Sequence, residues 1–227
     1  MKIRIAFLLF SLIFGWTGQA QQNSAQPKIN GPRLYGARPG KEFLYTIPAS
    51  GARPMQFEVK NLPKGVKFNK RNGVISGVIK KAGQYAIELV AQNEFGKVSK
   101  VFTLVIGDKL ALTPPMGWSS WYSFGRNVTL DKVIRSAEII KEKGLQNYGW
   151  SVIEIDDPWT NQPDKNDAVW YQLQSGGKAI YGYYEGPDNL LERQGQMRNS
   201  KGELLPNTFF TNIKKFPTIM HEMGFKA

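Results

Sequence analysis

Two adjacent carboxylates, Asp156 and Asp157, stand directly after a short apolar run that starts at Trp150. The run predicts a mostly buried strand, and an ionised carboxylate is costly to remove from water unless it has a partner. Carboxylates accept charge-assisted hydrogen bonds, and the hydroxyl groups of sugars are suitable donors. We therefore expect the pair to bind ligand hydroxyls, with a helix cap or a structural salt bridge at the strand end as the alternative.

Two tryptophans, Trp118 and Trp121, lie three positions apart in an aromatic segment, residues 114–124. Aromatic faces at the end of a strand pack well against the apolar faces of a sugar ring. The alternative is that both are core residues, which is the commoner fate of tryptophan. We expect Trp118 to belong to the core and Trp121 to line a ligand site.

The spacing of the two acids argues against a role as a catalytic pair. Glycoside cleavage with retention needs two carboxyl groups about 5–5.5 Å apart on either side of one bond, and cleavage with inversion needs about 6.5–9.5 Å. Neighbours on one strand cannot flank a bond in this way, although they can bind hydroxyls of one ring. Asp156 and Asp157 are therefore assigned to binding, and no catalytic residue is assigned within the chain.

A helix is predicted between the two motifs. Thr129 is a good N-cap residue, Asp131 places a negative charge in the first turn, and Gly144 ends the apolar periodicity. The apolar run 150–156 then predicts a strand. The resulting strand–helix–strand order predicts a parallel sheet.

The rest of this region is less regular. Residues 157–208 form a long connection rich in Gly, Asn and Gln, and connections of this length are usually functional unless they carry small elements of their own. Residues 213–223 predict another helix, and residues 224–227 predict the approach to a further strand.

Residues 30–107 predict an all-β unit. Short runs of aromatic and β-branched residues alternate with turns that contain Gly, Pro and Asn, which is typical of an antiparallel sandwich. Asn72-Gly73 between two such runs predicts a type I′ hairpin turn, which needs positive φ at both residues.

This region resembles the Ig-like domains of bacterial surface and secreted proteins in the sequences LPKGV (62–66), NGVISG (72–77), GQY (83–85) and AQN (91–93). The resemblance implies an Ig-like sandwich. Such modules usually act as spacers or packing partners, and carbohydrate binding is the less favoured role.

The first 20 residues predict a secretory signal peptide. Lys2 and Arg4 provide a positive end, an apolar stretch follows, and Gly18-Gln19-Ala20 offers small residues for cleavage. The stretch is too short for a comfortable membrane span, so we expect no stable membrane anchor, with an uncleaved N-terminal anchor as the alternative. The chain has no cysteine to carry a lipid. We expect a secreted or periplasmic protein.

Composition disfavours two classes of partner. The formal net charge is +12, but the lysines and arginines are scattered, and no nucleic-acid motif accompanies them. We expect a solvated basic surface and no nucleic-acid partner. A single histidine, His221, and the lack of cysteine disfavour a zinc or other transition-metal site.

Three motifs, in their order and spacing, resemble the start of glycoside hydrolase family 27, the α-galactosidase or melibiase group. They are PPMGWSSWYSF (114–124), IEIDDPW (153–159), and KKFPTIM (214–220) followed by GFK (224–226). The resemblance implies a retaining enzyme with a (β/α)8 TIM barrel that cleaves terminal α-galactosides of oligo- or polysaccharides without metal or cofactor. It also implies that Trp121 lines the galactose pocket, while Asp156 and Asp157 bind the outer hydroxyls of the sugar.

The expected fold is thus multi-domain, with an all-β Ig-like sandwich followed by the first part of an α/β TIM barrel. In barrels of this kind the active site lies at the C-terminal ends of the strands. The first strand is expected near Met116, the second to end at Asp156, and the third to begin near Phe225. The predicted divisions are a signal peptide (1–20), a flexible lead-in (21–29), the sandwich (30–107), a linker (108–115) and the incomplete barrel (116–227).

Residues 116–227 are too few for a whole barrel, which takes about 250 residues. In the family the nucleophile lies on the fourth strand and the acid/base residue on the sixth, so both are expected beyond Ala227 and this chain alone is expected to be inactive. An incomplete barrel leaves an open parallel edge. The alternatives are a non-catalytic secreted carbohydrate-binding protein and a degenerate gene remnant.

The sequence departs from the family at three places. Pro158 stands where cysteine is frequent, Tyr122 stands where asparagine is frequent, and residues 160–200 form a longer segment than usual. The sugar therefore stays open between galactose, N-acetylgalactosamine and arabinopyranose.

Overall fold

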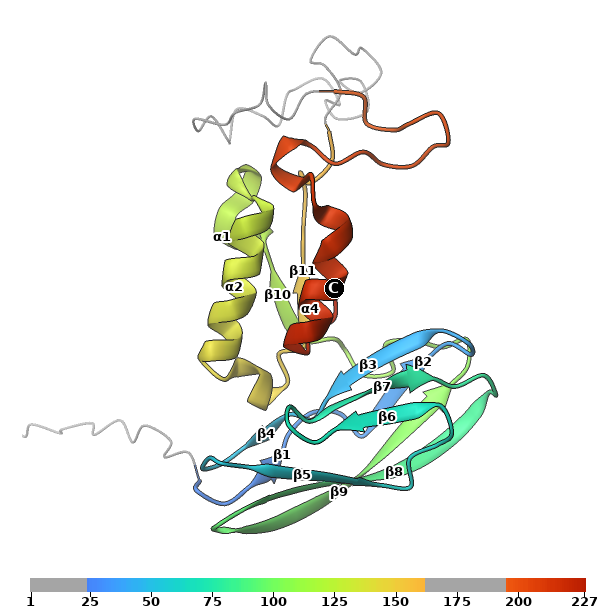
Figure 1. Cartoon of the computed structure of the whole chain (residues 1–227), viewed down its shortest axis with the longest axis vertical. Helices are drawn as coiled ribbons and strands as arrows, with labels where there is room; N and C mark the ends of the chain where they lie inside the picture. Colours follow the sequence, from blue (N-terminus) through green and yellow to red (C-terminus); the bar gives the residue numbers. More distant parts are fainter. Residues whose placement is uncertain (1–23, 162–194) are drawn as a thin grey trace, which may run out of the picture.

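The computed structural model describes residues 24–161 and 195–227, which form two units along the long axis of the molecule (Figure 1). One unit is a β-sandwich, residues 28–106, and the other is an α/β unit made of residues 116–161 and 195–227. The predicted signal peptide, residues 1–20, and residues 162–194 of the long connection lie outside the described residues.

The sandwich consists of a four-stranded and a three-stranded sheet. The larger sheet has the order β2-β9-β8-β5, the smaller has the order β3-β7-β6, and β1 pairs with β4 at one end. The pairing of β2 with β9 is parallel, so the prediction of a wholly antiparallel sandwich is wrong at this edge. The strands are β1 (Lys28–Ile29), β2 (Leu34–Ala37), β3 (Glu42–Thr46), β4 (Ala49–Ser50), β5 (Gln56–Lys60), β6 (Val66–Asn69), β7 (Val74–Val78), β8 (Gly83–Asn93) and β9 (Gly96–Ile106).

Alternating side chains of the two sheets fill one apolar core. On β3, Phe43 and Tyr45 point inward, and both are almost fully buried. The Tyr45 ring stacks on Phe102 of the opposite sheet with the ring centroids 4.3 Å apart. Period-two burial of large aromatic and branched side chains is what the sequence pattern predicts for a sandwich.

Two details of the sandwich differ from the expectation. Strand β1 lies inside the segment 21–29 that was predicted to be a flexible lead-in, because Lys28 and Ile29 pair with β4. The hairpin between β6 and β7 exists, but residues 70–73 form a four-residue loop in which only Gly73 has positive φ. The prediction of a type I′ turn is therefore wrong. The Asn72 side chain instead accepts a hydrogen bond from the Val74 amide at 3.2 Å.

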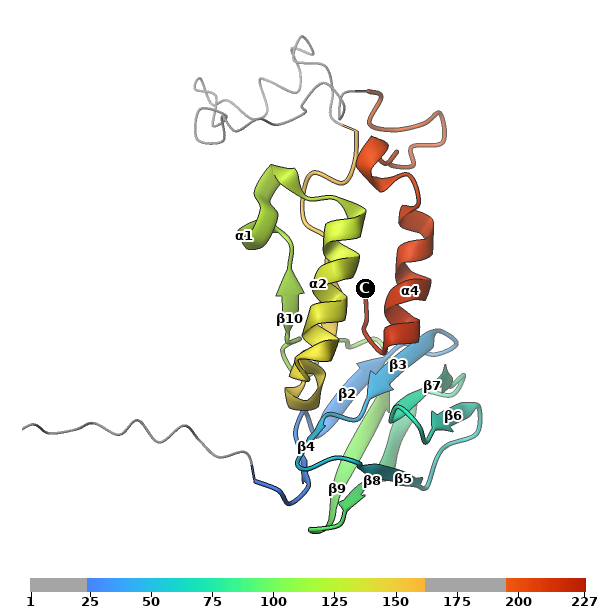
Figure 2. The same ribbon diagram turned by 60° about the vertical axis from the view of Figure 1, so that its left-hand side comes forward.

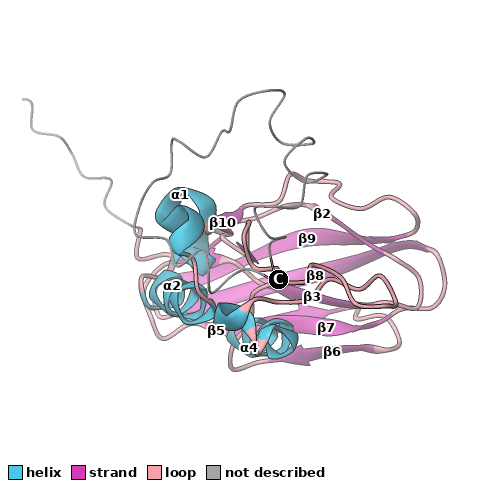
Figure 3. Cartoon of the chain, turned by 90° about the horizontal axis from the view of Figure 1, so that it is seen from above, coloured by secondary structure: helices cyan, strands magenta, loops and turns pink. Residues whose placement is uncertain are grey.

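The α/β unit is built on two short parallel strands, β10 (Gly117–Ser119) and β11 (Val152–Glu154). Helices α2 and α4 pack side by side and cover one face of these strands (Figure 2), and from above the helices lie over one end of the sandwich (Figure 3). No helix among the described residues combines the length and the apolar character needed to cross a membrane. The remaining elements are α1 (Trp121–Phe124), α2 (Leu130–Glu142), α4 (Phe216–Met223) and the 3-10 helices η1 (Gly125–Asn127), η2 (Leu145–Tyr148), η5 (Thr208–Phe210) and η6 (Ile213–Lys215).

Helix α2 forms as its sequence predicts. The Thr129 hydroxyl accepts a hydrogen bond from the Lys132 amide at 3.3 Å, and Asp131 lies in the first turn. Gly144 follows the helix in the left-handed conformation, with φ of 71°. The apolar face of the helix joins a second core that includes Ile153 of β11 and Met220 of α4.

The chain returns to the small sheet at Phe225, as predicted. The Lys226 amide donates to the Ser151 carbonyl at 2.8 Å, and the Ile153 amide donates to the Lys226 carbonyl at 2.9 Å. These two bonds place Lys226 beside Val152 in a parallel bridge. The strand predicted at 150–156 is shorter than expected, because only residues 152–154 have strand geometry.

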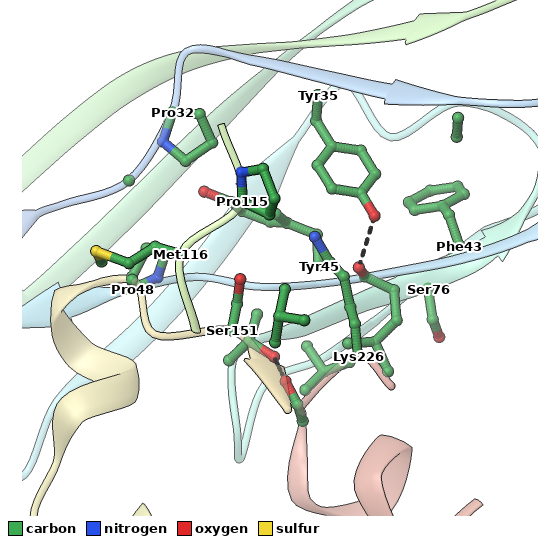
Figure 4. A pocket seen from close by; sticks show the side chains of 18 of the residues that line it. Pro32, Tyr35, Phe43, Tyr45, Pro48, Ser76, Pro115, Met116, Ser151 and Lys226 are labelled. Atoms are coloured by element: carbon green, nitrogen blue, oxygen red, sulfur yellow. Dashed lines mark hydrogen bonds between the residues drawn. The ribbon is translucent and has the colours of Figure 1, made fainter. Parts of the chain in front are cut away.

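A cavity of about 1160 Å³ lies between the two units, at the end of the α/β unit where its strands begin. Its lining comes from both units and includes Tyr35, Pro48, Met116, Ser151 and Lys226 (Figure 4). The Lys226 ammonium lies 4.2 Å from the centroid of the Tyr35 ring, a cation–π contact between the units. Burial lowers the pKa of Lys226 to about 8.

Replacing Gly117 by alanine should separate β10 from β11. A Cβ atom at this position would overlap the Val152 carbonyl oxygen, which is backbone and cannot turn aside. We expect Gly117→Ala to lower the free energy of unfolding by about 1–3 kcal/mol, the usual effect of overpacking. Urea denaturation followed by tryptophan fluorescence measures this. Gly107→Ala is the control, since nothing lies within 4 Å of its added Cβ; equal effects would contradict the prediction.

Lys226 should make the free energy of unfolding rise with pH between about pH 8 and pH 10.5. Its pKa is about 8 in the folded protein and 10.5 ordinarily, so between these values the folded state has released a proton that the unfolded state keeps. Lys226→Met should therefore gain stability over the wild type at pH 7 and lose part of that advantage at pH 9.5. Urea denaturation at both pH values tests this, with the exposed Lys201→Met as control. An advantage that is the same at both pH values would contradict it.

Candidate functional site

The structure brings the three predicted binding residues to the same edge of the small sheet. Trp121 comes two positions after β10 and Asp156 two positions after β11, and the two strands run parallel with Ser119 beside Glu154. Their C-terminal ends point away from the sandwich (Figure 1). Trp121, Asp156 and Asp157 thus lie at the end of the unit opposite the cavity.

Ser120 links the ends of β10 and β11 through two hydrogen bonds. Its hydroxyl accepts a hydrogen bond from the Asp156 amide at 2.9 Å, and its own amide donates to the Glu154 carbonyl at 3.2 Å. Ser120 is fully buried, and its carbonyl accepts from the Phe124 amide at 3.0 Å. One small side chain therefore fixes the start of α1 against the segment that carries the two acids.

The Asp156 carboxylate is held by neighbouring groups. Its Oδ1 atom accepts from the Asp157 amide at 2.7 Å, and its Oδ2 atom lies 3.5 Å from the Ser119 hydroxyl. Asp156 is half-buried, whereas Asp157 is exposed. The alternation of β11 puts Glu154 on the strand face opposite Ile153, which faces the helices. Acidic groups therefore gather at the end of one strand, where they can accept hydrogen bonds from a polyhydroxyl ligand.

The two tryptophans have different surroundings. Trp118 packs against the second core and meets Phe124 edge-on at 6.0 Å between ring centroids, and its indole N–H donates to the Ser123 hydroxyl at 3.1 Å. It is only half-buried, so it borders the core. Trp121 opens helix α1 and is also half-buried, while its neighbour Tyr122 is 98% exposed.

Asn207 is a positioning residue that sequence reasoning missed. Its side-chain amide donates to the Pro158 carbonyl at 2.7 Å and to the Thr160 carbonyl at 3.1 Å, and its Oδ1 atom accepts from the Phe209 amide at 3.0 Å. It is 1% exposed, so these bonds satisfy an otherwise buried amide. Nothing in the segment around Asn207, LLPNTFF (204–210), marks it, whereas Ser120 could have been noticed between the two tryptophans.

The described part of the site offers binding groups rather than a bond-cleaving pair. Asp156 and Asp157 are consecutive on one chain segment, so they cannot stand on opposite sides of a substrate bond. Within residues 24–161 and 195–227, no group of three or more His, Cys, Asp or Glu side chains is arranged to hold a metal ion.

Comparison with known proteins supports both predicted resemblances. Residues 26–107 match the family described as "Putative Ig domain". Alpha-galactosidase A of Cellvibrio japonicus is 40% identical over 80 residues, which are 34% of this chain and 20% of that protein.

Two crystal structures from Bacteroides fragilis NCTC 9343 are also similar, one of a "putative alpha-galactosidase" and one of a "putative alpha-galactosidase/melibiase". Each is 32% identical and aligns over 90% of this chain with a TM-score of 0.71. The alignments cover 37% of those chains, so this chain spans only part of the length of its relatives. The resemblance to α-galactosidases preceded by an Ig-like domain is thereby confirmed.

Ser120→Ala should loosen the candidate site. The change leaves the half-buried Asp156 amide without its acceptor, which lowers the free energy of unfolding by about 1–3 kcal/mol. The adjacent Ser119→Ala is a matched control, because it removes only the long 3.5 Å contact to the carboxylate. Urea denaturation compares the two variants, and an equal loss in both would show that the Ser120 bond is not the stronger constraint.

Proposed function

We propose that this chain forms the N-terminal part of a secreted, retaining glycoside hydrolase that acts on terminal α-galactosides. The observation that carries the proposal is the placement of Trp121, Asp156 and Asp157 at the C-terminal edge of one parallel sheet. The identity of 40% to an alpha-galactosidase supports it independently.

The α/β unit corresponds in this proposal to the opening of a (β/α)8 barrel. Its order of β10, α2, β11, α4 and the bridge at Lys226 is the alternation of strands and helices that such a barrel repeats. The candidate site lies at the strand ends that carry active sites in barrels, and the cavity lies at the opposite face.

Each binding residue has a chemical role in the proposal. Trp121 packs against the apolar face of the galactose ring, and the Asp156 and Asp157 carboxylates accept hydrogen bonds from its hydroxyls. Ser120 and Asn207 hold these groups in place without touching the sugar. The nucleophile and the acid/base residue belong to later strands, so the 227 residues alone bind but do not cleave. Galactose is favoured over N-acetylgalactosamine and arabinopyranose by the names of the relatives.

Export is part of the same proposal. Residues 1–20 carry the pattern of a signal peptide, and removal of that segment would deliver the protein to the periplasm or the medium.

The coding DNA after Ala227 provides the first test. A reading frame that continues through the remaining barrel strands supports an enzyme, and the longer protein should hydrolyse 4-nitrophenyl α-D-galactopyranoside. Asp157→Asn in that protein should lower kcat/KM by about 10- to 100-fold, the loss of one charge-assisted hydrogen bond. Asp108→Asn, in the exposed linker, should leave it unchanged.

The 227-residue chain provides the complementary test. It should release no nitrophenol above buffer, and isothermal titration should detect galactose binding that Asp157→Ala abolishes. Hydrolysis by this chain would place catalytic groups within it and overturn the division of roles. A stop codon after Ala227 together with galactose binding would instead favour a non-catalytic binding protein.

A further inference from the structure

The sandwich is fastened to the α/β unit by side-chain hydrogen bonds at two separate places. At the first, the Thr46 hydroxyl of β3 donates to the Gly224 carbonyl at 2.6 Å. At the second, the Arg53 guanidinium donates to the Asn147 side-chain oxygen at 2.6 Å, and the Asn30 amide donates to the Asn147 carbonyl at 2.8 Å. Each of these bonds has its donor in the sandwich and its acceptor in the α/β unit.

At Gly224 the backbone of the α/β unit lies very close to the sandwich. Gly224 ends helix α4 in the left-handed conformation, with φ of 87°, which a glycine adopts without strain. A Cβ atom here would lie 2.9 Å from the Thr46 hydroxyl oxygen and 3.6 Å from Val74 of β7. Because Gly224 has no side chain, it can end the helix in this conformation, and the smaller sheet of the sandwich can contact its backbone.

Both segments held by these hydrogen bonds lie shortly before residues that pair in the small sheet. Gly224 is followed by Phe225 and then by Lys226, which pairs with Val152 at the start of β11. Asn147 lies in η2, the turn between α2 and β11. The sandwich thus holds the segments that lead into β11 and into the Lys226 bridge beside it, and Asp156 follows two positions after β11 ends.

The arrangement of the two units is shared with solved relatives. One superposition aligns 90% of this chain with each Bacteroides fragilis structure at a TM-score of 0.71. The sandwich is well under half of the chain, so this agreement requires both units to superpose together. A sandwich on a loose linker would not keep one position in separate structures.

We propose that the sandwich is an intramolecular brace, which sets the position where β11 and its neighbour begin and so supports the segment that presents Asp156 and Asp157. In this role the sandwich surface around Thr46 and Arg53 binds the α/β unit of its own chain rather than a glycan. The proposal does not depend on which sugar the site takes, because it concerns the coupling between the two units.

Hydrogen–deuterium exchange on the whole chain tests the brace. Thr46→Val removes the hydroxyl at nearly constant shape and leaves the Gly224 carbonyl without this donor. We expect the amides of Ile153 and Lys226 to exchange about tenfold faster, a ratio equivalent to about 1.4 kcal/mol of local opening free energy. Amides of β8 and β9 should keep their rates.

Two matched variants separate the brace from a general loss of stability. Thr46→Ser keeps the hydroxyl and should exchange like the wild type. Thr103→Val makes the same chemical change at a half-buried position of β9 and should leave exchange at Ile153 and Lys226 unchanged. Faster exchange throughout the sandwich in Thr46→Val, or none beyond that of Thr103→Val, would overturn the proposal.

The hydrogen bond between Arg53 and Asn147 provides an independent test. Arg53→Gln removes the donor to Asn147 on another part of the interface, and it should speed the same Ile153 amide by a similar factor. Unchanged exchange at Ile153 in Arg53→Gln would show that only the Gly224 contact acts on β11 and that the brace as proposed is wrong. Neither Arg53 nor Thr46 lies at the candidate sugar site, so failure of the brace would leave the proposed function standing.

Discussion

The pairing of β10 with β11 is the contact on which the rest of the α/β unit depends. These strands lie on either side of α2 in the sequence, and only their parallel register brings Trp121 and Asp156 to one edge. The backbone at Gly117 approaches so closely that no side chain fits. Once the strands are paired, Ile153 presents an apolar surface that α2 and α4 cover, and the second core forms around it.

The parts of the structure that sequence predicts well are those decided by local chemistry. Helix α2 has its N-cap, its charged first turn and its terminating glycine within one continuous segment, so each signal could be read without knowing the fold. The same holds for the inward alternation of β3. The strand before the two acids was predicted to be mostly buried, but within β11 only Ile153 is buried. The placement of Asp156 and Asp157 at the same sheet edge as Trp121 followed from the strand–helix–strand order.

The parts that escaped prediction depend on partners far away in the sequence. The Asn207 side chain donates to carbonyl groups 47 and 49 positions earlier in the sequence, and the residues around Asn207 give no sign of these contacts. The parallel edge strand β2 is decided by where its chain enters the sandwich, because isolated strand patterns do not reveal direction. At the β6–β7 hairpin the residues Asn-Gly were read as a two-residue turn, whereas a longer loop satisfies the backbone with positive φ at Gly73 only.

The distances along the chain between the fastened residues have a consequence for how the protein is made. Thr46 and Gly224 are 178 positions apart, and Asn30 and Asn147 are 117 apart. The strands of the sandwich are complete at Ile106, so this unit can fold during synthesis before most of the α/β unit has left the ribosome. The growing α/β unit then meets a finished surface, and the slow closure of the longest loops is confined to the last step of assembly.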